Sequence, residues 1–538
     1  MPNKFTHSWK FIERGLPLFL ITLLVLGVFF RFANLGKKIY WFDEVYTSLR
    51  VAGYTEYELV QTLSTNPEIG GKELQNYQRI NPEKTLFNTI HSLALEDAQH
   101  PPLYYILARF WVQVWGDSVA IIRSFTALTS LLVFPCLYWL CLELFNSSLM
   151  GWVAIALVSV SPFHVALAQE AREYTLWTVT ILLSGALVLR AMRLKTRMSW
   201  VIYGASIGVG LYTFPLTGLV AIGYGIYVFV IEKFRLSKTV IACLLASVSA
   251  ILIFIPWIWV IFNSLHRINR TTAWATKSPS PFSLVKSWVG DLSRVFIDFG
   301  LHGNSNQASS YFLIPISLIL LILVGYSLYF ICRNSPKNVW LFIVSLIGVT
   351  GLALVLPDLI LGGRRSTAGR YLIPCYLGIE IAIAYLFTTQ ITTISSNKQS
   401  QKLWKLVMVV LLSSGILSCA VSSQSESGWT KAINYYNPAV ARLINQANHP
   451  LVISDAYIGD VLSLNYLLNP NVQFQLNPPC YSCYLDSSSR VQLEGPQNTK
   501  SFSDVFLFKP SQVLQDKFEQ EYRIESIYEG DILWQIKN

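Results

Sequence analysis

The segment GLPLFLITLLVLGVFFRFANLGKKIYWFDEVYT, residues 15–47, leads from a long apolar stretch directly into an adjacent pair of carboxylates. Residues 15–33 are long and apolar enough to cross a membrane as a helix. Asp43 and Glu44 follow within ten residues of its end. Because charged side chains at a membrane are costly to keep, this pair indicates a functional site beside the membrane.

The composition is that of a polytopic membrane protein. Of 538 residues, 53% are hydrophobic, 14% aromatic and 13% charged, and the mean hydropathy is +0.43, whereas soluble proteins carry about 25% charged residues. The chain has 41 Lys and Arg against 31 Asp and Glu. In a membrane protein such basic residues set the topology of short loops, so we do not expect nucleic acid as a partner.

Ten further apolar stretches follow, at 119–142, 149–165, 174–192, 199–214, 217–232, 238–262, 311–332, 338–356, 371–391 and 403–421. Each is long enough to cross the bilayer or nearly so, which predicts about eleven transmembrane helices. Residues 199–232 are interpreted as a short pair rather than one long helix. Basic residues stand on both sides of this stretch, and such residues favour the cytoplasmic side, so an even number of crossings is needed.

The charge pattern also predicts the orientation and the domains. Lys4, Lys10 and Arg14 precede the first helix and place the N-terminus in the cytoplasm. An odd number of spans puts residues 422–538 on the same outer side as the first loop, 34–118. Alternating helix-like stretches and short apolar strands predict a small α/β extracytoplasmic domain for 422–538. Residues 1–421 would then form the transmembrane catalytic domain.

The eight cysteines divide into two groups. Six fall in apolar runs, where a lone cysteine usually behaves as a small buried hydrophobe. Cys480 and Cys483 form a single C-x-x-C near the C-terminus, and one such pair does not predict a zinc site. The sequence leaves open whether these two form a local disulfide in an oxidising compartment or stay as two free thiols.

Basic residues also gather in loops that the topology places outside, against the usual tendency. They are Arg267, Arg270, Lys277, Lys286, Arg294, Arg364, Arg365 and Arg370. A third outer loop carries Glu170, Arg172 and Glu173 beside a helix start. These charges indicate an anionic ligand, with lipid headgroups or ion pairs inside a solvated helix cap as the alternatives.

Four motifs in order on this outer side resemble the GT-C superfamily of polyprenyl-phosphate-dependent glycosyltransferases. They are the Asp43-Glu44 pair, HPPLYY at 100–105, QEAREY at 169–174 and RYLIP at 370–374. Within the superfamily the chain is most similar to the protein O-mannosyltransferase and aminoarabinose-transferase type, with its bacterial family 39 relatives. The resemblance covers roughly residues 10–390 and implies a GT-C-like helical fold in the plasma membrane.

The resemblance also implies roles for the motif residues. Asp43 would act as the general base that removes the acceptor proton, with Glu44 orienting it or adjusting its pKa. Arg172 and Arg370 would bind the donor phosphate as its negative charge develops. His100 stands where part of the family has a lysine, which would make its phosphate contact dependent on pH.

Further contacts are expected around these residues. Tyr105, Tyr174 and Tyr371 are candidates for contact with substrate, although an interfacial aromatic belt is the alternative for such residues. Glu170 together with Asp43 could hold a divalent cation, as acidic residues do in oligosaccharide-transferring relatives. Because no cluster with ligand spacing stands in the sequence, we expect no obligatory metal, with Mg or Mn as the alternative.

The expected function is transfer of a sugar from a polyprenyl-phosphate donor to a protein, lipid or glycan acceptor at the outer face of the plasma membrane. The lipid bilayer and the lipid-linked donor are thus the expected partners. One competing function is a transporter or flippase of an anionic lipid-linked glycan precursor. That function would place more charge inside the spans, where Glu380 alone looks embedded. A ligase that joins preassembled glycans is a second alternative. Such ligases lack an Asp-Glu pair in the first outer loop.

Overall fold

The computed structural model describes residues 15–300, 307–393, 398–485 and 502–537, and it divides into two compact units. The membrane unit takes its described residues from 1–35, 123–259 and 272–424, and the sheet unit from 36–122, 260–271 and 425–538. Lys4, Lys10 and Arg14, on which the predicted orientation depends, lie outside the described residues.

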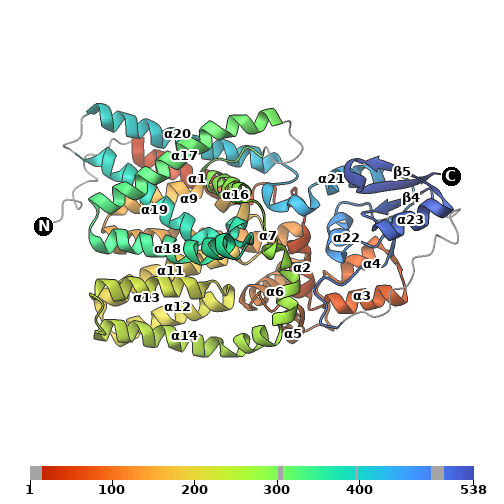
Figure 1. Ribbon diagram of the computed structural model, residues 1–538, viewed down its shortest axis with the longest axis horizontal. Coiled ribbons are helices and arrows are strands. Elements are labelled where there is room, and N and C mark those ends of the chain that lie inside the picture. The colour runs from red at the N-terminus through yellow and green to blue at the C-terminus, as the bar shows by residue number, and fades with distance from the viewer. Residues whose placement is uncertain (1–14, 301–306, 394–397, 486–501, 538) are drawn as a thin grey trace. The chain divides into compact units, whose positions relative to one another are not determined.

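The membrane unit consists of helices (Figure 1). They are α1 (Gly15–Phe32), α7 (Val119–Leu131), α8 (Val133–Phe145), α9 (Ser148–Ser159), α10 (Pro162–Ala168), α11 (Tyr174–Leu194), α12 (Arg197–Thr213), α13 (Thr217–Ile231), α14 (Lys238–Asn263), α16 (Pro281–Phe296), α17 (Gln307–Asn334), α18 (Lys337–Ile360), α19 (Ile373–Thr392) and α20 (Lys398–Gln424). The first residues of α7 and the last of α14 already belong to the sheet unit.

Eight stretches of the described chain are long and apolar enough to cross a membrane, which shows a multi-pass membrane protein. The count rises to nine if α9 and α10, which are bent by 68° at their junction, form one broken span. The prediction of about eleven also counted α12 and α13. These helices have 17 and 15 residues, so they reach the bilayer thickness only in part.

Helix α19 lies at the centre of the membrane unit. It packs against α9, α17, α18 and α20, and 89% of its most apolar stretch of 18 residues is buried. By contrast, only 22% of the corresponding stretch of α17 and 28% of that of α14 are buried. Their outward side chains are large and apolar, as expected for a surface that meets lipid rather than water. The centre of the unit is therefore where polar side chains need partners.

The sheet unit is built on six strands in the order β1-β3-β2-β4-β6-β5. Their bounds are β1 (Glu68–Gly70), β2 (Pro450–Ser454), β3 (Gln473–Leu476), β4 (Asp504–Phe508), β5 (Arg523–Tyr528) and β6 (Leu533–Lys537). Strand β2 pairs in parallel with β3 and β4, and the remaining pairs are antiparallel. Strand β2, apolar up to its last residue Ser454, is buried along its whole length, as expected for a central parallel strand.

Helices complete the sheet unit. They are α2 (Phe42–Ala52), α3 (Glu56–Thr65), α4 (Gly71–Asn76), α5 (Leu86–Glu96), α6 (Leu103–Trp115), α15 (Leu265–Thr271), α21 (Asn437–Ile444), α22 (Ile458–Asn465) and α23 (Gln512–Glu521). Leu514 and Phe518 of α23 pack against Leu451 and Leu507 of the sheet to form a core. The predicted α/β character of the C-terminal segment is confirmed, while β1, β5 and α23 were not anticipated.

The grouping of the first outer loop differs from the prediction, which placed residues 34–118 in a transmembrane domain of 1–421 and kept 422–538 separate. In the structure residues 36–122 group with 425–538. The physical reason is pairing across the sequence, since β1 hydrogen-bonds to β3 and α2 packs against α22. The helix that carries Asp43 is thus built into the same unit as the C-terminal segment.

Candidate active site

Helix α2 positions the two carboxylates in its first turn, immediately after Trp41 as the N-terminal cap residue. Trp41 itself makes no side-chain cap hydrogen bond, and the negative charges of Asp43 and Glu44 suit the positive end of the helix dipole. The helix ends at Gly53, which adopts φ +90°, where a side chain would be strained. Stabilisation of the helix start explains the presence of both acidic residues. The different surroundings of Asp43 and Glu44 must therefore distinguish their roles.

Glu44 is fully buried and forms an ion pair. Its Oε2 lies 2.8 Å from Nζ of Lys431, whose side chain is 2% exposed. Lys431 belongs to a 3-10 helix, η5 (Trp429–Asn434), and its ammonium also lies over the Trp41 ring at 5.7 Å. Asp43, by contrast, is only half-buried. Of the two carboxylates, Asp43 is therefore the more accessible, and Glu44 holds the helix in place.

Other residues fix the start of α2 from the C-terminal segment. Oδ1 of Asn434 accepts a hydrogen bond from the Phe42 backbone N–H at 2.8 Å. Helix α22 approaches so closely that a Cβ at Gly459 would lie 2.7 Å from ring atoms of both Phe42 and Tyr46. A glycine is needed for this contact. The backbone of Asp43 is thus held on both sides by residues more than 380 positions away in the chain.

The Glu44–Lys431 pair leads to a stability prediction. Lys431→Met should lower the free energy of unfolding by about 3–5 kcal/mol, because it leaves a buried carboxylate without its charge partner. Adding Glu44→Gln to Lys431→Met should restore part of the loss by removing that charge. Thermal unfolding of the purified protein in detergent checks this, and a double variant less stable than Lys431→Met would contradict the pairing.

The predicted phosphate ligand His100 lies in the sheet unit. Its Nδ1 is 2.8 Å from Oδ1 of Asp97, and the side chain of Gln99 donates to the same oxygen at 2.6 Å. The His100 ring lies 6.5 Å from the ring of Tyr105, which is fully buried. This contact with the Asp97 carboxylate orients the His100 ring.

The QEAREY loop lies in the membrane unit between α10 and α11. The Gln169 side-chain amide donates to the backbone carbonyls of Phe30 at 2.7 Å and Ala33 at 2.9 Å, which ties the loop to the end of α1. Glu170 and Arg172 are both buried, and the N–H of Arg172 donates to the Glu170 carbonyl at 2.8 Å. The loop is therefore a fixed part of the membrane unit rather than a solvated cap.

Two arginines from distant segments meet at one tyrosine. The Arg172 guanidinium lies 5.7 Å from the Tyr174 ring centre, and that of Arg370 lies 5.4 Å from the same ring. Arg370 belongs to the 3-10 turn η4 (Gly369–Leu372) and also lies 5.6 Å from the Tyr371 ring. Glu173 lies 3.4 Å from Arg172 and balances its charge. The sequence-predicted group of Arg172, Tyr174, Arg370 and Tyr371 is thus brought together.

Further aromatic rings pack against the tyrosines of this group. Phe214 stacks against Tyr371 with ring centres 5.8 Å apart, and it packs edge-on against Tyr174 at 5.5 Å. Trp177, one turn further along α11, lies 4.8 Å from the same Phe214 ring. Rings packed in this way hold each guanidinium in a defined position, as cation–π contacts do. Phe214 directly follows α12 and was not among the predicted site residues.

A buried polar pair joins the two segments that carry these arginines. Nε2 of His164 on α10 lies 3.0 Å from Oε2 of Glu380 on α19, and both side chains are at most 5% exposed. The chain runs from α10 into the Arg172 loop, while the Arg370 turn leads into α19. Glu380 was correctly predicted to be embedded, and its partner His164 was not anticipated.

The His164–Glu380 pair gives a second stability prediction. Glu380→Ala should lower the unfolding temperature in detergent because it leaves a buried imidazole without its hydrogen-bond partner. Glu380→Gln should lose less, since an amide oxygen can still accept from a neutral imidazole. Fluorescence-monitored thermal unfolding distinguishes the two variants. Equal unfolding temperatures for the parent and Glu380→Ala would show that the pair contributes nothing.

The structure therefore offers one group of candidate residues in each unit. The sheet unit carries Asp43, Glu44, His100 and Tyr105, and the membrane unit carries Glu170, Arg172, Tyr174, Arg370 and Tyr371. Within the described ranges, no group of three or more His, Cys, Asp or Glu residues is placed to hold a metal ion. Lys431, Asn434 and Gly459 were missed because a single sequence carries no signal of contacts over such separations.

Comparisons with known proteins add three findings. Residues 99–260 match the family described as dolichyl-phosphate-mannose-protein mannosyltransferase, a stretch that contains His100, Glu170 and Arg172. ArnT from Cupriavidus metallidurans bound to undecaprenyl phosphate is similar at 13% identity, with a TM-score of 0.49 and 98% of both chains covered. No curated protein sequence matches the chain.

A second similar structure is AglB, the oligosaccharyltransferase of Archaeoglobus fulgidus, in complex with an inhibitory peptide and a dolichol-phosphate. The identity is 11% and the TM-score 0.48, and the match covers 85% of this chain and 65% of that one. ArnT from Cupriavidus metallidurans in the apo state matches at 13% identity and a TM-score of 0.49, with 97% of each chain covered.

Proposed function

We propose that this chain, a membrane glycosyltransferase of the GT-C superfamily, moves a single sugar from a polyprenyl-phosphate donor to a hydroxyl or amine acceptor at the outer face of the plasma membrane. The family description that matches residues 99–260 names a lipid-phosphate-linked sugar, which supports a donor of this class. A protein, a lipid and a glycan all remain acceptor classes at this stage.

The observation that carries the proposal is the convergence of Arg172 and Arg370 on the Tyr174 ring. Two guanidinium groups held at the start of a membrane helix suit a phosphate at the surface of a bilayer. Guanidinium groups form bidentate, charge-assisted hydrogen bonds to phosphate oxygens. They would bind the donor and stabilise the charge that develops as the phosphate leaves.

The proposed reaction uses the candidate residues of both units. The acceptor oxygen or nitrogen attacks the anomeric carbon of the donor sugar, and the bond from that carbon to the phosphate oxygen breaks. The electron pair of the broken bond leaves with polyprenyl phosphate, and the acceptor proton passes to the carboxylate of Asp43. Attack opposite the leaving group inverts the anomeric configuration. Glu44 acts through its pair with Lys431 and keeps the first turn of α2 in place.

A flippase of a lipid-linked precursor is the second candidate, because the buried His164–Glu380 pair inside the membrane unit resembles the ionisable pairs of transporters. One pair in the centre of the unit is also explained by its position between the Arg172 and Arg370 segments. We favour the transferase because the ionisable motif residues lie at helix starts, in the first turn of α2 and just before α11 and α19.

Analysis of lipid-linked intermediates tests the function. Mass spectrometry of lipids from cells that lack the protein should reveal an accumulated polyprenyl-phosphate sugar, which identifies the donor. A transferase leaves this charged donor on the outer leaflet, where a membrane-impermeant enzyme or reagent can reach it. Accumulation on the inner leaflet alone would show a flippase, and no accumulation would contradict both functions.

Metal dependence has its own prediction. We propose that transfer needs no divalent cation, because the two arginines already supply the positive charge for the leaving phosphate. Activity of the purified protein should then persist in excess EDTA and should not rise when Mg²⁺ or Mn²⁺ is restored. A loss in EDTA that Mn²⁺ or Mg²⁺ reverses would instead point to cation binding by acidic residues such as Glu170.

A further inference from the structure

The loop from Cys480 to Cys483, here called the cystine loop, is held by one carboxylate of the sheet unit. The structure joins the two cysteines in a disulfide with their Cα atoms 5.5 Å apart, so of the two states left open by the sequence it has the bridged one. The backbone N–H of Tyr481 donates to Glu56 at 2.9 Å, and that of Ser482 donates to the same carboxylate at 2.6 Å. The Ser482 hydroxyl adds a third hydrogen bond at 2.5 Å.

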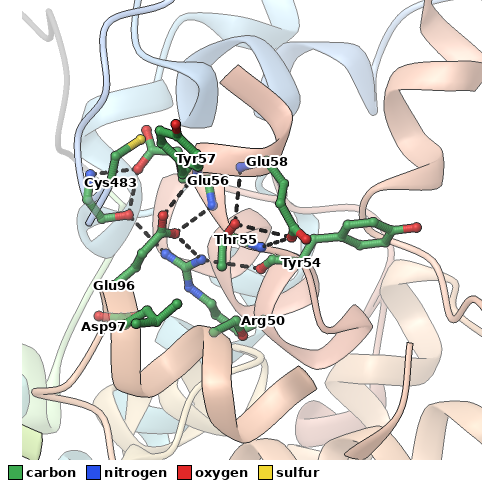
Figure 2. A network of polar contacts seen from close by, with 12 residues as sticks. Arg50, Tyr54, Thr55, Glu56, Tyr57, Glu58, Glu96, Asp97 and Cys483 are labelled. Atoms are coloured by element: carbon green, nitrogen blue, oxygen red, sulfur yellow. Dashed lines mark hydrogen bonds and ion pairs between the residues drawn. The ribbon is translucent and has the colours of Figure 1, made fainter. Parts of the chain in front are cut away.

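Glu56 belongs to a buried charged network (Figure 2). Glu96 lies 2.6 Å from Arg50 and accepts hydrogen bonds from the backbone N–H groups of Glu56 and Tyr57 at 2.6 and 3.0 Å. It therefore caps the first turn of α3, where the helix dipole favours a negative charge. Arg50 also donates to the Ser482 hydroxyl at 2.9 Å, which connects the network to the cystine loop.

Holding this short loop with buried charged groups costs free energy. Removing a carboxylate or guanidinium from water costs several kcal/mol per ion before its new partners compensate. Burial raises the pKa of Glu96 although Arg50 is adjacent, which is a sign of that cost. The disulfide already restricts the loop, so the network of Arg50, Glu56 and Glu96 is more than closure requires. The network therefore fixes the position of the loop against α2 and α3.

The cystine loop places Tyr481 beside the start of α2. The Tyr481 ring lies 5.4 Å from Phe42, the residue before Asp43, and 6.1 Å from Tyr46 one turn later. Its hydroxyl donates to the Thr271 carbonyl at 2.7 Å. Burial, followed by the negative charge of Asp43, raises the pKa of Tyr481, so the phenol stays protonated and keeps this bond.

A second tyrosine extends this aromatic surface outward. The ring of Tyr457 lies 5.5 Å from that of Tyr481 and is 43% exposed, while Tyr481 is half-buried. Tyr457 immediately precedes α22, the helix whose Gly459 packs against Phe42. The two tyrosines therefore form a partly exposed aromatic surface that reaches from solvent to the residues around Asp43.

We propose that Tyr481 and Tyr457 form the acceptor subsite of the transferase and that the acceptor is a neutral glycan, an inference that rests on the proposed function. A sugar ring presents C–H groups that an aromatic face attracts, and its hydroxyls donate to carboxylates such as Asp43. Asp43 directly follows Phe42, on which the Tyr481 ring packs, and it is half-buried. The two arginines that contact the loop, Arg50 and Arg270, bind Glu96 and the Cys483 carbonyl. The negative charge of Asp43 therefore disfavours a phosphorylated or acidic acceptor.

Binding to a panel of defined probes tests this subsite. The purified full-length protein in detergent is applied to neutral oligosaccharides of hexoses and N-acetylhexosamines, to phosphorylated and sialylated oligosaccharides, and to Ser/Thr-containing peptides. The parent should bind at least one neutral oligosaccharide and prefer it to its acidic counterpart. Tyr481→Ala should weaken this binding at least about tenfold, whereas Tyr481→Phe, which keeps the ring, should stay within about threefold.

Matched variants separate the subsite from general effects of the loop. Tyr484 directly follows the same loop and packs on the ring of Tyr57 at 5.0 Å, so Tyr484→Ala should bind as the parent does. Reduction of the Cys480–Cys483 disulfide should weaken glycan binding by the parent. A variant with both cysteines replaced by serine should bind weakly with or without reductant.

Three results would overturn the inference. They are a parent that binds only peptides or acidic probes, a parent that binds no probe, and a Tyr481→Ala variant with parental affinity. If Tyr481→Ala fails to fold, Tyr457→Ala replaces it, because Tyr457 is exposed. Undecaprenyl phosphate is titrated into the same samples. If the parent binds undecaprenyl phosphate but no neutral glycan, this subsite is refuted and the proposed function stands. If the parent does not bind undecaprenyl phosphate, the proposed function itself is refuted.

Discussion

Replacement of Asp43 by asparagine is expected to lower sugar transfer by about 10²- to 10⁴-fold, the usual contribution of a general base. The amide has nearly the shape of the carboxylate but cannot accept the acceptor proton. Because Asp43 is only half-buried, its loss should cost the fold little beyond about 0.3–1 kcal/mol of helix-dipole stabilisation. Transfer rate, thermal unfolding and undecaprenyl phosphate affinity are measured on the same preparation.

The control for Asp43→Asn is Asp117→Asn, which changes another carboxylate of the sheet unit. Asp117 has a side chain 39% exposed and lies 3.9 Å from Arg79, so its loss should leave transfer unchanged. An Asp43→Asn protein that transfers sugar at the parental rate would show that another group accepts the proton. Glu44 is a poor substitute, since its carboxylate is fully buried against Lys431.

The second large effect is expected for the donor phosphate. Replacing both Arg172 and Arg370 with alanine should weaken binding of undecaprenyl phosphate by about a hundredfold or more. Each charge-assisted hydrogen bond contributes about 1.5–3 kcal/mol, and each 1.4 kcal/mol corresponds to about tenfold in affinity. Each single variant should retain only roughly a tenth to a hundredth of the parental affinity. Titration of the lipid into detergent-purified protein measures the dissociation constants.

Arg193→Ala is the matched control for the arginine variants. Arg193 lies in the last turn of α11, the helix that begins at Tyr174, and it pairs with Glu143 while remaining 62% exposed. Its replacement changes the net charge equally but should leave lipid affinity within about twofold. If the double variant binds undecaprenyl phosphate as tightly as Arg193→Ala does, the phosphate site lies elsewhere.

Much of the fold could be predicted because a membrane imposes strong local constraints. Apolar runs such as that of α19 must be helical and must have a certain length, so hydropathy alone located them. The helix count was the less certain part, because α12 and α13 are shorter than a full span. The family match over residues 99–260 supports the predicted GT-C resemblance in that stretch, which contains two of the four motifs, HPPLYY and QEAREY.

The candidate site was predictable only where the sequence marks function locally. Charged motif residues such as Asp43 and Arg172 stand out because they are costly beside a membrane. The residues that hold them do not stand out, since Lys431 and Tyr481 are ordinary residues of a polar segment. Their importance arises from contacts with α2 across more than 380 positions, which no local pattern records.

Release of free polyprenyl phosphate is the measurement that tests the proposed transferase most directly. The donor lipid identified from the deletion strain is mixed with purified protein and acceptor extract, and the lipid products are quantified by mass spectrometry. The parent should convert charged donor into free polyprenyl phosphate as the acceptor gains the sugar, and Asp43→Asn should leave the donor intact while still binding it. A parent that binds the donor but releases no polyprenyl phosphate would contradict transfer as the function of this protein.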